Sequence, residues 1–135
     1  MPERRKGLFR QIVEGLEAVQ RLLGVLQGAI GGMPPIPNMG GQGYYDAQNA
    51  YLQQHVHPSV RQLLEARAGL HTALEGLRVY RDTNSNSDGG RDEARVNLAE
   101  REPQANALDQ QLQALFQPIE GQPGDVIRRL KQQLE

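Results

Sequence analysis

The sequence has 135 residues, enough for a single domain, and 38% of them are hydrophobic. It contains no cysteine and no tryptophan, which excludes disulfides and thiolate metal sites and argues against base-stacking surfaces. The formal net charge of −1 excludes a uniformly basic nucleic-acid-binding protein. Leu, Ile, Val and Phe make up only about a quarter of the chain, so we expect a thin core that gains from burial by other subunits.

The composition favours helices, because Leu, Gln, Ala, Arg and Glu are abundant and all are good helix formers. We expect one all-α domain over residues 1–135, a helical bundle of about four to six helices with a long Pro/Gly loop after the first helix. No segment resembles a signal peptide or a membrane span. We therefore expect a cytoplasmic protein, or one incorporated into a virion or another particle.

The first predicted helix covers residues 1–32 and carries a continuous apolar seam. Its apolar side chains recur at alternating spacings of three and four, the pattern of a helix that packs nearly parallel or antiparallel to another. The seam consists of Phe9, Ile12, Leu16, Val19, Leu23, Leu26 and Ile30.

The end of this helix has a second feature, a glycine at every fourth position on the side away from the seam. Gly24, Gly28 and Gly32 each weaken the helix by about 1 kcal/mol relative to alanine, yet small residues at this spacing let another backbone approach closely. A helix end that is apolar on all sides is expected to be buried on all sides. We therefore expect Leu23 in the core and the glycines against a neighbouring chain.

Residues 33–43 are predicted to form a long loop rich in proline and glycine. Ordering such a segment costs roughly 1 kcal/mol or more per residue, so we expect a neighbouring chain to hold it in place. The candidate interaction residues are accordingly Leu23, Gly24, Gly28, Gly32, Met33, Ile36, Met39, Tyr44 and Tyr45.

Residues 44–81 are predicted to be helical with a break at Pro58. Proline disfavours helical geometry in the residue before it, so a short helix should end at His57, and Ser59 can cap the next one. That second helix, 59–81, carries another seam, with Leu64 and Leu74 beside it. The seam consists of Leu63, Ala66, Leu70, Ala73, Leu77 and Tyr80.

Short helices are predicted for residues 91–135, after a polar loop at 82–90. A weak helix at 91–101 should be followed by one that Pro103 opens at its first turn. The last helix should begin at Asp125, which can cap it. The helix after Pro103 has its apolar side chains at Ala105, Leu108, Leu112 and Leu115.

The polar loop resembles a calcium-binding loop over only twelve residues. Counting from Asp82 places Asp82, Asn84, Asn86 and Glu93 at ligand positions, but Ser87 stands where the sharp turn requires glycine. We interpret the segment as a solvated connection and assign no metal or other cofactor.

Other constellations do not indicate catalysis. No cysteine or nearby acidic residue completes a metal site with His55 and His57, and none of the three serines lies in a nucleophile-elbow context. We therefore expect no enzymatic activity and no catalytic residues. The basic residues are grouped near the predicted helix termini, where they suit the helix dipole without indicating nucleic acid. They are Arg4, Arg5, Lys6 and Arg10, and Arg128, Arg129 and Lys131.

Together these features predict a non-enzymatic structural or assembly protein that packs through helical seams into a larger oligomeric particle. Its partners would be further copies of itself or other subunits, and a bacteriophage virion is one such particle. Two alternatives stay open. One is a membrane-interacting protein acting through its N-terminal amphipathic helix, and the other is a small binding module with a calcium site in the loop 82–93.

Overall fold

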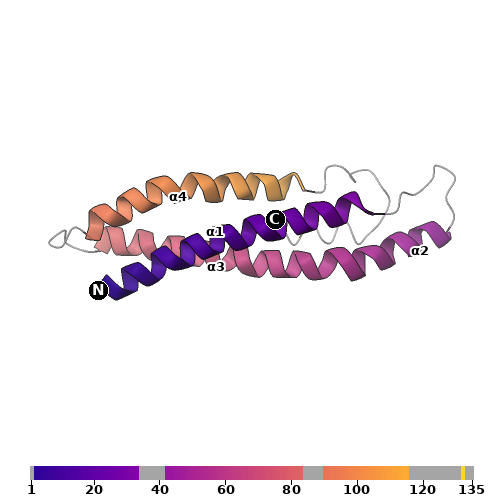
Figure 1. The fold of residues 1–135 in the computed structure, drawn as a ribbon, viewed down its shortest axis with the longest axis horizontal. Coiled ribbons are helices and arrows are strands. Elements are labelled where there is room, and N and C mark those ends of the chain that lie inside the picture. The colour runs from indigo at the N-terminus through magenta and orange to yellow at the C-terminus, as the bar shows by residue number, and fades with distance from the viewer. Residues whose placement is uncertain (1, 34–41, 84–89, 116–131, 133–135) are drawn as a thin grey trace. The chain divides into compact units, whose positions relative to one another are not determined.

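The computed structural model describes residues 2–33, 42–83, 90–115 and 132, and each described element is a helix (Figure 1). The expected all-α fold is confirmed. The expected count of four to six helices and the Pro/Gly loop stay predictions, because residues 34–41 and 116–131 lie outside the described part. The elements are α1 (Pro2–Gly31), α2 (Gln42–Tyr51), the π-helix η1 (Leu52–Val56), α3 (His57–Thr83) and α4 (Gly90–Gln113).

The chain divides into two compact units. Unit 1 comprises residues 1–20 and 65–109, and unit 2 comprises residues 21–64 and 110–135. Helices α1, α3 and α4 each contribute residues to both units.

In unit 1 the predicted apolar seams supply most of the core, and Leu74, Ala94 and Leu98 add to it. α1 and α3 approach closely, because a Cβ atom built on Gly15 would lie 3.1 Å from the Cβ of Leu70. Gly76 lies similarly close to Leu8, with 3.0 Å from its Cβ position to Cδ2. The buried apolar residues of unit 1 are Ile12, Leu16, Val19, Leu70, Ala73, Leu74, Leu77, Tyr80, Ala94, Leu98, Ala105 and Leu108.

In unit 2 the end of α1 packs with α2, η1 and the first part of α3. The Tyr51 hydroxyl donates a hydrogen bond of 2.7 Å to the carbonyl oxygen of Ala29, in the last turn of α1. The same carbonyl also accepts the Gly32 N–H at 3.2 Å, so the hydroxyl adds a second hydrogen bond at this helix end. The buried residues of unit 2 are Leu22, Leu23, Leu26, Ile30, Gln48, Leu52, Val56, Val60, Leu63, Leu112 and Leu115.

The helix does not break at Pro58. Figure 1 shows α2 running into α3 without interruption, and His57 has helical angles, with φ −58° and ψ −47°. Because the His57 N–H donates to the Leu52 carbonyl five residues earlier, the π-turn shifts the hydrogen-bond register just before the proline. The predicted break and the Ser59 cap are therefore wrong. The Ser59 hydroxyl instead donates back to the carbonyl four residues earlier, at 3.4 Å.

α4 also continues through a proline that was expected to open a new helix. Pro103 lies inside α4, where proline removes one backbone hydrogen bond and costs about 3 kcal/mol. The prediction of two helices is wrong because a single buried face extends across Pro103. On that face Leu98 precedes the proline and Ala105 follows it, and both are buried.

Other helix boundaries differ from the expected ones by a few residues. α2 begins at Gln42, two residues earlier than expected, and α3 includes Asp82 and Thr83 of the expected polar loop. Gly90 belongs to α4, which shortens the loop further. The last predicted helix, from Asp125, lies outside the described residues except for position 132.

Candidate functional site

A polar cluster in unit 1 joins α3 to α4. Arg67 and His71 lie one turn apart on α3, and both contact the Asp109 carboxylate on α4. The Arg67 Nε–Asp109 Oδ1 distance is 2.8 Å and the His71 Nε2–Asp109 Oδ2 distance is 2.9 Å. The Asp109 side chain is 22% exposed, so these contacts are partly shielded from water. The cluster fixes the two helices relative to each other within unit 1.

A second ion pair links the same helices. Arg78 Nε donates to Glu102 Oε1 on α4 at 3.2 Å, and its Nη1 donates to Glu75 Oε2 at 3.1 Å. Partial burial acts to lower the pKa of Arg78. The hydrogen bonds with Glu75 and Glu102 outweigh it, so the pKa is raised above its ordinary value.

Arg81 and Asp82 form an exposed pair at the end of α3. The Arg81 Nε donates to Asp82 Oδ1 at 2.8 Å, and Nη2 donates to Oδ2 at 3.4 Å. These hydrogen bonds lower the pKa of Asp82 and raise the pKa of Arg81. The Asp82 carboxylate, which would be the first ligand in the alternative of a calcium loop, is therefore bound by a neighbouring cation.

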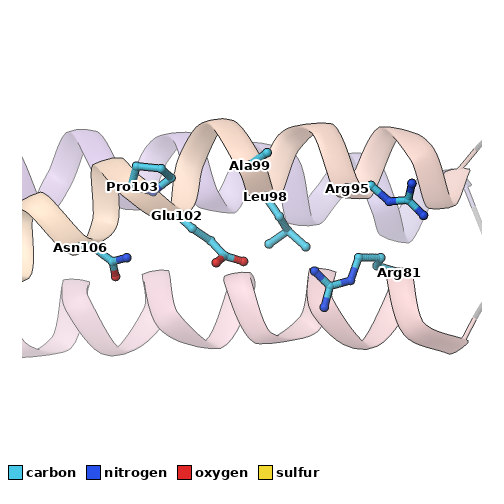
Figure 2. Close-up of a pocket in the computed structure, with 7 residues that line it drawn as sticks. All are labelled: Arg81, Arg95, Leu98, Ala99, Glu102, Pro103 and Asn106. Carbon is cyan, nitrogen blue, oxygen red and sulfur yellow. The ribbon is translucent and has the colours of Figure 1, made fainter.

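A cavity of about 330 Å³ lies beside these pairs in unit 1. Figure 2 shows Leu98, Glu102 and Asn106 extending from α4 toward α3, and Arg81 extending from α3 toward α4. The cavity combines cationic donors with a carboxylate that Arg78 already occupies. Its lining can hold water and small polar groups, and it contains no nucleophilic side chain. The lining residues are Arg81, Arg95, Leu98, Ala99, Glu102, Pro103 and Asn106.

The predicted interaction residues at the end of α1 differ in their surroundings. Leu23 is 2% exposed and belongs to the core of unit 2, as expected. Gly24 and Gly28 are exposed, and no described atom lies within 4 Å of a Cβ atom built on either of them. Val25 between them is 52% exposed. We call Gly24, Val25 and Gly28 the glycine face of α1.

Gly32 does not share these surroundings. A Cβ atom on Gly32 would lie 2.9 Å from the Tyr51 hydroxyl oxygen, so the close approach there comes from a side chain of the same chain. Met33 is half-buried at the end of α1. Tyr44 and Tyr45 belong to the backbone of α2, whereas Ile36 and Met39 lie outside the described residues.

Among the described residues, the candidate metal ligands do not form a cluster. Asp82 and Glu93 lie on α3 and α4, and the other two loop positions fall outside the described residues. His55 packs against the Tyr51 ring, with 4.7 Å between ring centroids. Within residues 2–33, 42–83, 90–115 and 132, no group of three or more His, Cys, Asp or Glu side chains can hold a metal ion.

Two features were missed by the sequence reasoning. The Asp109 cluster has a local signal, since Arg67 and His71 are four residues apart on one helix face, but the sequence does not show which acid they meet. The second feature is an uncharged strip on α4, and we call it the α4 ridge. It was missed because the predicted helix stopped before Pro103. The ridge consists of Val96, Ala99, Pro103 and Ala107, all exposed.

Comparisons with other proteins give no functional assignment. No protein-family model, no curated protein and no solved structure matches the chain. None of the described helices is both long and apolar enough to cross a membrane.

Proposed function

We propose that the chain is a non-enzymatic structural or assembly protein whose copies pack through exposed helix faces into a larger oligomer. The glycine face of α1 carries this proposal. Gly24 and Gly28 each weaken α1 by about 1 kcal/mol relative to alanine. The described residues offer no compensating contact, because nothing lies within 4 Å of either Cβ position. A neighbouring backbone packed on this face would supply one.

The exposed valine beside the glycines supports the same conclusion. Val25 is 52% exposed and adds apolar surface that only a partner would bury. A particle built from repeated subunits, such as a bacteriophage virion or its assembly machinery, would be a suitable setting.

Native mass spectrometry of the purified full chain tests the proposal, with Gly28→Leu as the disrupting variant. Open space surrounds the Gly28 Cβ position, so a leucine side chain fits the monomer and blocks only an incoming helix. We expect the variant to form smaller oligomers than the parent, because it loses the contact at this face. Gly7→Leu is the matched control, since Gly7 is also exposed on α1 with nothing described within 4 Å.

A monomeric parent would contradict the proposal. Flotation of the chain with liposomes, lost in Gly28→Leu and kept in Gly7→Leu, would show that lipid and not protein covers the glycine face.

A further inference from the structure

We propose that the copies associate through unit 1, with the α4 ridge of one copy inserted into a groove between α1 and α3 of the next. This inference rests on the proposed function and adds a second contact between copies, beside the one that the glycine face makes. It depends on surfaces of unit 1 and not on the glycine face in unit 2.

The groove is a cavity of about 460 Å³ between α1 and α3. Small residues from both helices form much of its lining, and a helix can approach closely where side chains are this short. Gly69 is exposed, and nothing described lies within 4 Å of its Cβ position, so the groove is open there. The lining residues are Gln11, Glu14, Gly15, Ala18, Ala66, Gly69, Leu70 and Thr72.

The α4 ridge has the shape and polarity that this groove requires. Its residues follow one another at spacings of three, four and four, which places them along one stripe of the helix. None is charged, and Val96 is 63% exposed. Figure 2 draws Ala99 and Pro103 on the side of α4 away from α3, and both residues also line the cavity that Arg81 of α3 lines.

The charges beside the two surfaces are also complementary. Among the residues that line the groove, only Glu14 is charged. Arg95 flanks the ridge next to Ala99, and its side chain is 60% exposed. Its contact with Asp92 is 4.0 Å, so the guanidinium can turn toward a carboxylate of another copy. Two grooves that face each other are disfavoured, because the Glu14 side chains of the two copies would then repel each other.

A ridge and a groove on separate helices give a head-to-tail contact, which produces closed rings or open chains of copies. The ridge spans twelve residues, roughly 18 Å of helix. One helix segment of this length is a small contact beside the roughly 1,000 Å² that specific interfaces bury, so we expect weak association unless further faces join.

Two blocking variants of the full chain test the contact by sedimentation velocity, and each is made together with Gly28→Leu so that the glycine face does not contribute. Gly69→Arg fills the groove and leaves the ridge intact, whereas Ala99→Arg places a charge on the ridge and leaves the groove intact. We expect each of them to lower self-association at least tenfold relative to Gly28→Leu alone. An equimolar mixture should form a one-to-one dimer that does not grow, because only one ridge and one groove remain able to meet. Ala68→Arg in the same background, at an exposed position of α3 outside the groove, should associate like Gly28→Leu alone.

The outcomes separate the two proposals. A parent that stays monomeric contradicts both. The ridge-and-groove contact alone is overturned if the parent associates and Gly28→Leu alone is monomeric, or if Gly69→Arg or Ala99→Arg associates as well as Gly28→Leu alone. The contact is also overturned if both variants are monomeric and their mixture stays monomeric, since an intact ridge and an intact groove on separate copies would then fail to meet.

Discussion

Gly32 and Tyr51 form a matched pair in unit 2, in which a missing side chain leaves room for a hydroxyl group. The Tyr51 hydroxyl donates to the Ala29 carbonyl at 2.7 Å, and a Cβ atom on Gly32 would lie 2.9 Å from the hydroxyl oxygen. The hydroxyl therefore cannot keep its place when residue 32 has a side chain. The sequence shows the glycine spacing that includes Gly32 but not which group occupies the space.

We predict that the effect of Gly32→Ala on stability depends on Tyr51. In the parent, alanine gains about 0.4–1 kcal/mol from reduced unfolded-state entropy but loses a hydrogen bond of about 0.5–1.5 kcal/mol. In the Tyr51→Phe variant only the gain remains, so Gly32→Ala should stabilise the protein there. Urea denaturation of the four proteins should give a coupling of about 1 kcal/mol.

Gly7→Ala is the control for this cycle, because nothing described lies near its Cβ position and Gly7 is not part of the glycine face. It should stabilise the parent and the Tyr51→Phe variant equally. Equal effects of Gly32→Ala in both backgrounds would show that the hydroxyl and residue 32 do not compete for space.

Asp82 provides a prediction about pH. The hydrogen bonds from Arg81 lower its pKa, and Arg91 contributes a smaller Coulombic effect in the same direction. A carboxylate with a lowered pKa in the folded state stabilises that state above its ordinary pKa, and the contribution disappears as the pH falls through the folded value. NMR titration should show that Arg81→Gln raises the pKa of Asp82, and that Arg91→Gln raises it less. The reverse order would contradict the assigned hydrogen bonds.

Along the helices, the buried residues are mostly those that the apolar spacing predicts. The helix ends depend on hydrogen bonds and packing that the spacing does not show. Six of the seven seam residues of α1 are buried, and Phe9 is half-buried. The local cost of a proline predicts a helix boundary at each of the two sites. It does not show that the residues on both sides are buried. At Pro58 the π-turn shifts the hydrogen-bond register, so the helix continues through the proline. At Pro103 the buried face of α4 continues past the proline.

Pro103→Ala tests this explanation. Pro103 is exposed, so its replacement removes no core packing, while alanine restores an N–H donor inside α4. We expect stabilisation by about 1–3 kcal/mol in urea denaturation at constant protein concentration. A proline at the first turn of a new helix would be nearly neutral to the same change. A neutral result would therefore favour two helices.

Asp109 is the acid on which the contact between α3 and α4 in unit 1 depends most. Asp109→Asn removes the charge that receives Arg67 Nε at 2.8 Å and His71 Nε2 at 2.9 Å. We expect destabilisation by about 1–2 kcal/mol, because hydrogen bonds to a charged group are stronger than neutral ones and these are partly buried. Glu65→Gln, at an exposed position of α3, should change stability by less than about 0.5 kcal/mol. If both substitutions change stability by similar amounts, the contacts of Asp109 do not stabilise the protein more than an exposed glutamate does.

The candidate site was less predictable than the fold for a physical reason. Helix spacing tells which residues share a face, but a salt bridge between helices depends on their relative rotation and register. Nothing in the sequence pairs Asp109 with Arg67 rather than with another arginine. The α4 ridge, in contrast, follows from spacing once α4 is known to be continuous.

At the scale of the whole molecule, exposed apolar surfaces occur in both units of a chain with few apolar residues. The glycine face belongs to unit 2, and the α4 ridge belongs to unit 1. Burying apolar area gives the main favourable energy of folding, so a chain with a thin core gains proportionally more from association. Folding and assembly of this protein should therefore be thermodynamically linked.

This linkage predicts that the melting temperature depends on protein concentration. Association with the folded state stabilises it by mass action, and a tenfold rise in concentration adds about 1.4 kcal/mol per contact once association is nearly complete. For a chain of this size the melting temperature should then rise by roughly 3–6 °C per tenfold increase. Both Gly28→Leu and Gly7→Leu gain helix propensity, so the slopes must be compared and not the absolute temperatures. Gly28→Leu should have a smaller slope than the parent, because it loses the contact at the glycine face, whereas Gly7→Leu should keep the slope of the parent. If the melting temperature of the parent does not change with concentration, its folded state is complete without a partner.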